Sequence, residues 1–293
     1  MHSVSPWCAA TTLYVPATAQ RFMENILQGK FPFLPSVTLC LEDAIRKRDI
    51  QEGIRCIRQF LTKLQDAPHI PLIFIRPRDK HVLSQLVDMQ LPGVTGFVLP
   101  KFRLQDASLW ERALADAPSL LMPTLETVEI FDQQALVEMR AAMLEGGFAQ
   151  RVIVVRVGGN DLQHLLGIAR SPQTTIYEGA MGYVLGMLAA TFIPHGLALS
   201  APVCSILNDP QLLARELDRD ILHGFYGKTV VHPAQLASVR QAFAVSMDDV
   251  AYAKAILEDA QPVFRYGAVM GEPAVQWRWA RTILERQNVF GTK

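Results

Sequence analysis

Charged side chains follow short apolar runs at several points along the chain, and their types suit metal and acid chemistry. The residues in these positions are Glu42, Asp43, Arg76, Lys101, Glu126, Asp161 and His232. Several carboxylates in one place repel one another and raise each other's pKa values, a repulsion that a bound divalent cation removes. Carboxylate oxygens, with water and substrate completing the shell, suit Mg²⁺. Arg76 adds a planar, two-pronged donor for a carboxylate or a developing enolate.

The run VIVVRVGGNDL, residues 152–162, indicates a buried strand that leads into two glycines and a carboxylate. It does not match the G-x-G-x-x-G pattern of dinucleotide-binding loops, and the sequence has no phosphate-binding P-loop. The small residues Gly158 and Gly159 would instead let the backbone turn sharply and bring Asp161 to a bound metal.

Short apolar or β-branched runs alternate with segments of helical period almost to the end of the chain. The predicted strands are residues 11–15, 37–41, 72–76, 96–99, 119–123, 152–157, 197–201 and 228–232. The predicted helices are residues 21–28, 50–64, 81–89, 104–115, 128–144, 161–167, 182–192, 210–223 and 233–245. Eight such units in roughly 230 residues favour a closed (β/α)8 barrel of the α/β class. Periodicity leaves an open, doubly wound sheet as the alternative.

Further helices are predicted at residues 247–260 and 273–287, joined by a flexible segment at residues 261–272. We therefore expect a catalytic barrel domain at 1–246 and a C-terminal helical extension at 247–293. If the barrel forms, its polar residues meet at the carboxyl ends of the strands, where such barrels carry out their chemistry.

Composition excludes several other classes of protein. The chain has 28 basic and 28 acidic residues and a formal net charge of zero, which argues against a nucleic-acid partner. The four cysteines form no zinc-like pattern and are expected to be reduced. We see no run long enough for a membrane span and no signal peptide, so we expect a cytoplasmic location and no membrane partner.

The ordered motifs resemble the citrate lyase β-subunit-like branch of the HpcH/HpaI aldolase superfamily. They are LYVP at 13–16, LEDA at 41–44, FIR at 74–76, VLPK at 98–101, LE at 125–126, NDL at 160–162 and GKTVVHPAQ at 227–235. The resemblance covers about residues 11–245. It implies a TIM barrel that uses Mg²⁺ to cleave or form carbon–carbon bonds next to a carboxylate. It also implies Glu126 and Asp161 as metal ligands and Arg76 as the substrate-binding arginine.

Members of this family act on thioesters of coenzyme A or on free hydroxy-keto acids. They are usually homotrimers or hexamers in which the C-terminal segment reaches a neighbouring subunit. This sequence departs from the family pattern at Cys40 and Gly271, where aspartates are common. Glu272 is therefore a candidate general base, supplied by a neighbouring chain. A basic cluster, Arg46 to Arg48, is a second departure that could hold an anionic substrate tail.

These observations predict a Mg²⁺-dependent carbon–carbon lyase that acts on a small-molecule carboxylate or acyl-CoA substrate. Arg76 and Glu126 are the predicted catalytic residues, and Glu126 and Asp161 the predicted metal ligands. Arg76, with Glu42, Asp43 and Lys101, is predicted to bind substrate. For the two ligands the alternative is a role at helix N-termini, and for His164 and His232 a packing or structural role. Two other functions stay open: a pyruvate-type aldolase on free hydroxy-keto acids, and a non-catalytic subunit of a larger assembly.

Overall fold

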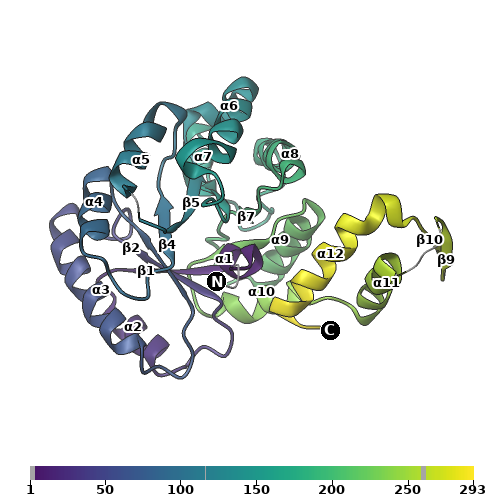
Figure 1. The fold of residues 1–293 in the computed structure, drawn as a ribbon, viewed down its shortest axis with the longest axis horizontal. Coiled ribbons are helices and arrows are strands. Elements are labelled where there is room, and N and C mark those ends of the chain that lie inside the picture. Colours follow the sequence, from purple (N-terminus) through teal and green to yellow (C-terminus); the bar gives the residue numbers. More distant parts are fainter. Residues whose placement is uncertain (1–3, 116, 259–261) are drawn as a thin grey trace.

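A computed structural model describes residues 4–115, 117–258 and 262–293, and these residues include a closed barrel of eight parallel strands. Each strand pairs with the next along the chain, and β8 pairs with β1 to close the ring (Figure 1). The strands are β1 (Thr12–Pro16), β2 (Ser36–Cys40), β3 (Leu72–Arg76), β4 (Gly96–Leu99), β5 (Leu120–Leu125), β6 (Val155–Val157), β7 (Leu199–Ala201) and β8 (Gly227–Val230). The predicted (β/α)8 barrel is confirmed, and the open-sheet alternative is wrong.

Helices lie around the outside of the barrel and bury their apolar faces against it (Figure 1). They are α2 (Gln20–Leu27), α3 (Ile50–Leu64), α4 (Lys80–Asp88), α5 (Ala107–Leu114), α6 (Gln133–Leu144), α7 (Gly159–Leu165), α8 (Ala180–Phe192), α9 (Pro210–Leu222) and α10 (Gln235–Phe243). Capping carboxylates fix several starts: Asp79 accepts a hydrogen bond from the Val82 amide at 2.9 Å, and Asp209 from the Leu212 amide at 2.8 Å.

The N-terminal end of the barrel is filled by apolar side chains and plugged by a short helix, α1 (Pro6–Ala10), which sequence analysis did not predict. The interior residues of this layer are Phe74, Val98, Met122, Val154 and Ala198, packed with Ala9 and Ala10 of the helix. The Ser200 hydroxyl donates to the Ala10 carbonyl at 2.7 Å and anchors the plug. With this end closed, the interior of the barrel can open only toward the carboxyl ends of the strands.

Two predictions within the elements are wrong. Strand β6 begins at Val155, and Val152 makes only an isolated bridge to Leu121. The segment predicted as a flexible joint forms, over its described residues, an antiparallel hairpin of β9 (Phe264–Tyr266) and β10 (Val269–Gly271). The Tyr252 hydroxyl donates to the Met270 carbonyl at 3.1 Å and ties the hairpin to the preceding helix.

The C-terminal extension has a small apolar core of its own. Helices α11 (Met247–Glu258) and α12 (Pro273–Phe290) pack through Val250, Ala253, Ile256, Ala280 and Ile283. Figure 1 shows these helices and the hairpin projecting from one side of the barrel, near α10. Helix α12 contacts the barrel at two points: the Arg278 guanidinium donates to the Pro194 carbonyl at 3.1 Å, and the Phe290 ring stacks on Phe243 with centroids 5.2 Å apart.

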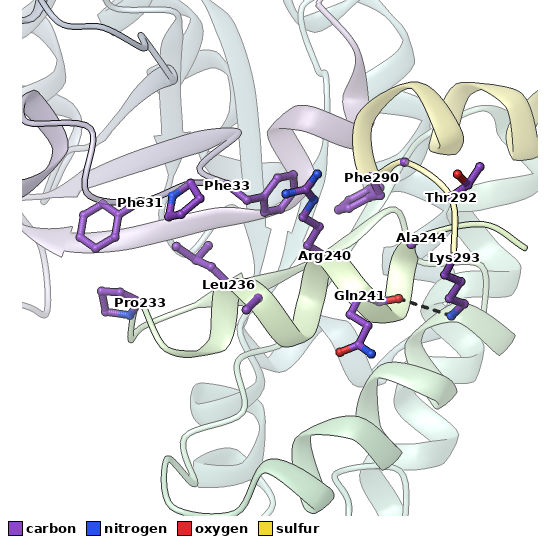
Figure 2. Close-up of a pocket in the computed structure, with 13 residues that line it drawn as sticks. Phe31, Phe33, Pro233, Leu236, Arg240, Gln241, Ala244, Phe290, Thr292 and Lys293 are labelled. Atoms are coloured by element: carbon purple, nitrogen blue, oxygen red, sulfur yellow. Dashed lines mark hydrogen bonds between the residues drawn. The ribbon is translucent and has the colours of Figure 1, made fainter.

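A groove of about 490 Å³ lies beside this anchor point, between α10, the end of α12 and the segment at Phe31 and Phe33 (Figure 2). The Lys293 ammonium donates to the Gln241 carbonyl at 3.4 Å across it. No Asp or Glu side chain of the described residues lines the groove, so the predicted acid chemistry lies elsewhere. Within the described part of the chain, no helix has the length and hydropathy needed to cross a membrane.

Candidate active site

The predicted charged residues converge at the carboxyl ends of strands β2 to β6, and Arg76 lies at the centre of them. Its Nε donates to Glu42 Oε2 at 2.7 Å, and its Nη2 donates to Glu126 Oε1 at 3.0 Å. All three side chains are buried. Because Arg76 ends β3 while Glu126 follows β5, their contact depends on the barrel bringing nonadjacent strands together.

Lys101 follows β4 and has a left-handed backbone conformation, with φ of 47°, that residues other than glycine rarely adopt. In this conformation its backbone amide donates to Glu126 Oε1 at 2.7 Å. Its ammonium reaches Glu42 Oε1 at 2.7 Å and Asp43 Oδ2 at 3.4 Å. Strained backbone of this kind persists where surrounding contacts hold it, which is common at functional sites. The turn therefore contributes both an amide and a charge to the cluster.

The two glycines of the GGND turn are explained by close packing. A Cβ atom on Gly158 would lie 2.3 Å from Glu126 Oε2 and 2.4 Å from Glu126 Cβ. A Cβ atom on Gly159 would lie 2.6 Å from Pro202 Cβ. Gly158 thus allows Glu126 to lie directly against the turn that begins α7, and Asp161 stands in the first turn of that helix.

Burial and repulsion from neighbouring carboxylates disfavour the charged forms of Glu126 and Asp161. The pKa of Glu126 is raised from 4.5 to about 7, chiefly by burial and also by the Asp161 charge, while the Arg76 charge lowers it. Burial and the Asp43 charge also raise the pKa of Asp161, against the Lys101 charge. Glu126 Oε2 accepts no hydrogen bond from the described residues, while Oε1 accepts two.

A cavity of about 420 Å³ opens at this end of the barrel and is lined by Arg76, Glu126 and Asp161, with Asp43 beside them. Glu42 does not line it, because both of its oxygens are bound to Arg76 and Lys101. Sequence analysis missed several lining residues that lie on strands rather than after them: Tyr14, Thr124, Arg156 and Thr229. A charged residue inside the apolar run VIVVRV was the available signal for Arg156.

A second cavity, of about 530 Å³, shares Glu126 and Asp161 with the first and is also lined by Lys101. It also contains the basic residues Arg78, Lys80 and Arg103 and the acidic residues Asp79, Asp106 and Glu129, so its wall carries charges of both signs. Asp106 forms ion pairs with Lys80 at 3.1 Å and with Arg103 at 2.8 Å, which neutralises part of the positive charge. The two cavities approach the same pair of carboxylates from different sides.

Other candidates from the sequence lie outside this cluster. His164 lines only the second cavity, and His232 is exposed, with its Nδ1 accepting from the Ala234 amide at 3.3 Å. Arg46 and Arg48 are exposed and pair with Asp49. Glu272 immediately precedes α12, whose opposite end carries the Phe290 contact with the barrel.

The structure also explains the glycine at position 271. A Cβ atom on Gly271 would lie 2.5 to 2.9 Å from three atoms of the Phe264 ring. A side chain at this position therefore requires the Phe264 ring to move.

The GKTVVHPAQ motif belongs mainly to the scaffold. Lys228 is buried and pairs with Asp220 at 3.0 Å and Glu216 at 3.4 Å, both on α9. The Gln235 amide donates to the Cys204 carbonyl at 2.8 Å and ties the end of the motif to the segment after β7. Only Thr229 and Val231 of this motif line the first cavity.

The donor set at the cavity fits a hard divalent cation that keeps part of its water. The described residues contain no group of three or more His, Cys, Asp or Glu side chains arranged to hold a metal. Glu126 and Asp161 offer two carboxylates, one of them with an uncommitted oxygen, at a position where charge is disfavoured without a cation. Two carboxylates completed by water and substrate are the usual shell for Mg²⁺.

Comparison with known proteins agrees with the fold. Residues 3–292 match the family model of the C-C bond lyases of the TIM-barrel fold. The (3S)-malyl-CoA thioesterase of Cereibacter sphaeroides is 31% identical over 270 residues, covering 91% of this chain and 87% of that protein. The citrate lyase subunit beta-like protein of Deinococcus radiodurans is 24% identical over 209 residues, or 69% of this chain and 68% of that protein.

Solved structures share the architecture at lower identity. A citrate lyase from Burkholderia xenovorans has a TM-score of 0.75 at 19% identity, covering 97% of this chain and 92% of its own. CitE from Mycobacterium tuberculosis, solved with magnesium, acetoacetate and coenzyme A, has a TM-score of 0.68 at 21% identity, covering 98% and 100%. The match over nearly the whole sequence, together with the closed barrel and its rim of charged residues, shows that this chain belongs to the C-C bond lyase family of the TIM-barrel fold.

Proposed function

We propose that this protein is a Mg²⁺-dependent carbon–carbon lyase that cleaves a hydroxyacyl thioester, or a related hydroxy acid, into a keto acid and an enolate-derived product. The observation that carries the proposal is the placement of Arg76 beside Glu126 and Asp161 in one cavity at the mouth of the barrel. Membership of the lyase family and the thioester named for the Cereibacter relative support it.

Glu126 and Asp161 would hold the metal, which when bound supplies a Lewis acid for the substrate hydroxyl and carboxylate oxygens. Cleavage removes the hydroxyl proton, forms a carbonyl, breaks the carbon–carbon bond and leaves its electron pair as an enolate. Arg76 is the group positioned to receive that charge, because its Nη1 donates to no described residue and the side chain lines the cavity. Such a donor is worth roughly 2–4 kcal/mol of transition-state stabilisation.

Glu42 and Lys101 would act on this chemistry by holding Arg76 and Glu126 in place. Glu42 fixes the Arg76 guanidinium by accepting a hydrogen bond from Arg76 Nε. The Lys101 amide donates to Glu126 Oε1 and so fixes the carboxylate with Oε2 uncommitted. Asp43 is the more exposed member of the predicted substrate-binding set and stands at the cavity wall. A group held by charged hydrogen bonds loses little further freedom when substrate arrives, which favours reaction.

A thioester substrate would extend into the second cavity. Its basic side chains, Arg78, Lys80 and Arg103, would contact the phosphates of a coenzyme A tail. This assignment replaces the exposed cluster at Arg46 as the preferred place for an anionic tail, because those side chains are directed to solvent and pair with Asp49.

We further propose a homo-oligomer, a trimer or a hexamer, in which the extension contacts a neighbouring chain. Its exposed apolar side chains support an interface: Val275 is 70% exposed, Met270 58% and Trp277 49%. Glu272 lines neither cavity that contains Glu126 and Asp161, so a role for it as general base requires a neighbouring chain. Sedimentation of the wild type and a Val275→Glu variant would test the interface.

Carbonyl release, trapped as a phenylhydrazone, tests the reaction directly. The panel holds citryl, malyl and methylmalyl thioesters and the corresponding free hydroxy-keto acids, each with and without Mg²⁺. We expect release from thioesters that depends on Mg²⁺ and is lost in Glu126→Gln. The matched control, Glu145→Gln, removes an exposed carboxylate at the end of α6 and should keep full activity. Full metal-dependent cleavage by Glu126→Gln would refute the site assignment.

Thioester hydrolysis is a second candidate, favoured by the 31% identity to the malyl-CoA thioesterase. It predicts release of free thiol without release of a keto acid from the same substrates. Cleavage of free acids alone would instead support the aldolase, a reading that the glycine at position 271 favours. Binding of Mg²⁺ and ligand without turnover would support a non-catalytic subunit.

A further inference from the structure

Arg156 is a buried cation without a carboxylate partner among the described residues. It lies on β6, is 1% exposed, and makes no ion pair within 4 Å. Its Nη2 donates to the Thr229 hydroxyl, its Nη1 lies 3.6 Å from the Met122 sulfur, and its guanidinium lies 5.3 Å from the centre of the Tyr14 ring. These are weak partners for a full charge, and an uncompensated buried charge destabilises a protein.

This guanidinium lies at the floor of the same cavity that holds Glu126 and Asp161 at its mouth. Arg156 is the register partner of Thr124, two residues before Glu126 on the neighbouring strand. The Cα atom of Arg156 is therefore level with a residue that lies two positions, roughly 7 Å of strand, before Glu126. The Thr124 hydroxyl lines the cavity as well, and it is buried without a hydrogen-bond partner in the described residues.

Arg156, which has no carboxylate partner among the described residues, and Thr124, whose hydroxyl has no hydrogen-bond partner there, thus line the same part of the cavity. We propose that Arg156 and Thr124 bind a second carboxylate of the substrate, so that the keto-acid half is a dicarboxylate rather than a monocarboxylate. The proposal rests on the proposed function, since the first carboxylate would be held at the mouth by the metal site. A planar guanidinium suits a carboxylate in a confined space, and its own burial would then be compensated by the ligand.

The charges of the cavity agree with an anionic ligand. Arg76, Lys101 and Arg156 oppose Glu42, Asp43, Glu126 and Asp161 in and around it. A divalent cation would turn the single excess negative charge of this set into a single excess positive one. Arg76 already has two carboxylate partners, at 2.6 and 3.0 Å. Arg156 has no carboxylate partner among the described residues, so it is the cation whose charge a ligand carboxylate would compensate.

Calorimetry on the Mg²⁺-loaded protein tests the subsite with two probes, pyruvate and 2-oxoglutarate, which differ in the second carboxylate. We expect the wild type to bind 2-oxoglutarate about 10- to 100-fold more tightly than pyruvate, the range for a hydrogen-bonded charged group. Arg156→Met should lose this preference and retain its affinity for pyruvate, and Arg156→Lys should keep part of the preference. Arg58→Met, at an exposed position on α3, is the matched control.

Thermal unfolding separates binding from a purely structural role. Arg156→Met should unfold at the same or a higher temperature than the wild type without ligand, because it removes an uncompensated charge. A lower unfolding temperature, with pyruvate and 2-oxoglutarate weakened equally, would overturn the proposal. In EDTA, succinate should raise the unfolding temperature of the wild type and leave that of Arg156→Met unchanged.

The succinate measurement does not depend on the metal site. If Mg²⁺-loaded wild type binds neither keto acid but succinate still stabilises it through Arg156, the proposed function fails and the carboxylate subsite stands. If succinate has no effect and the wild type does not prefer 2-oxoglutarate, the subsite itself is refuted.

Discussion

Replacing Gly158 by alanine would test how the backbone turn positions the candidate metal ligands. The glycine has φ of −85°, which alanine also adopts, so the substitution introduces no conformational penalty of its own. The added Cβ would lie 2.4 Å from Glu126 Cβ, an atom close to the backbone that rotation of the carboxylate cannot remove. Either β5 or the turn before α7 must therefore move.

Overpacking of this kind costs about 1–3 kcal/mol. In a chain of this size each kcal/mol lowers the unfolding midpoint by roughly 2–4 °C, so a fall of several degrees is expected. The displacement separates Glu126 from Asp161 and should also weaken Mg²⁺ binding. If the free energy of Mg²⁺ binding becomes less favourable by about 1.4 kcal/mol, the affinity falls about tenfold. Differential scanning calorimetry and Mg²⁺ titration measure the two effects.

Gly186→Ala is the matched control. Gly186 lies inside α8, and nothing stands within 4 Å of its added Cβ. Alanine there should stabilise the helix by up to about 1 kcal/mol and leave Mg²⁺ binding unchanged. If Gly158→Ala behaves like this control in both measurements, the close approach of Glu126 to the turn does not shape the site.

Other perturbations give equally direct outcomes. Since the pKa of Glu126 is raised to about 7, Mg²⁺ affinity should fall as pH drops below 7, and Glu126→Gln should abolish this dependence. In the metal-free protein the raised pKa stabilises the fold below pH 4.5, and this contribution disappears as pH rises through 7; urea unfolding of the wild type minus Glu126→Gln measures it. Lys228→Met should cost about 3–5 kcal/mol in urea unfolding, because it leaves the buried Asp220 without its cation; an unchanged midpoint would contradict a structural role. Gly271→Asp should destabilise the extension by collision with Phe264, seen as loss of hydrogen-exchange protection in the hairpin, and should not raise activity.

Strands β6 and β8 illustrate how neighbouring residues of one barrel strand take structural and chemical roles. On β6, Val155 packs in the main apolar core, while the next residue, Arg156, lines the cavity. On β8, Lys228 pairs with α9 and Thr229 lines the cavity. Because successive side chains of a strand point to opposite faces, adjacent residues of one motif can serve the scaffold and the site separately.

The sequence by itself determined the order of the elements and the rim position of the main charged residues. Strands at residues 72–76 and 96–99 and the helix at residues 50–64 have the predicted bounds, because apolar periodicity and length are local signals. Glu126, Asp161, Arg76 and Lys101 were predicted at strand ends, and the carboxyl ends of parallel strands meet on one rim of a barrel.

Tertiary structure decided what depends on contacts between distant segments. Closure of the barrel, the plug formed by α1 and the hairpin before α12 leave no periodic signature in the sequence. Pairing also decides which groups remain free: Glu42 is occupied by Arg76 and Lys101, whereas Arg156 has no carboxylate partner among the described residues. The charge of a side chain can be read from sequence, but its partners and its depth are set by the strand register.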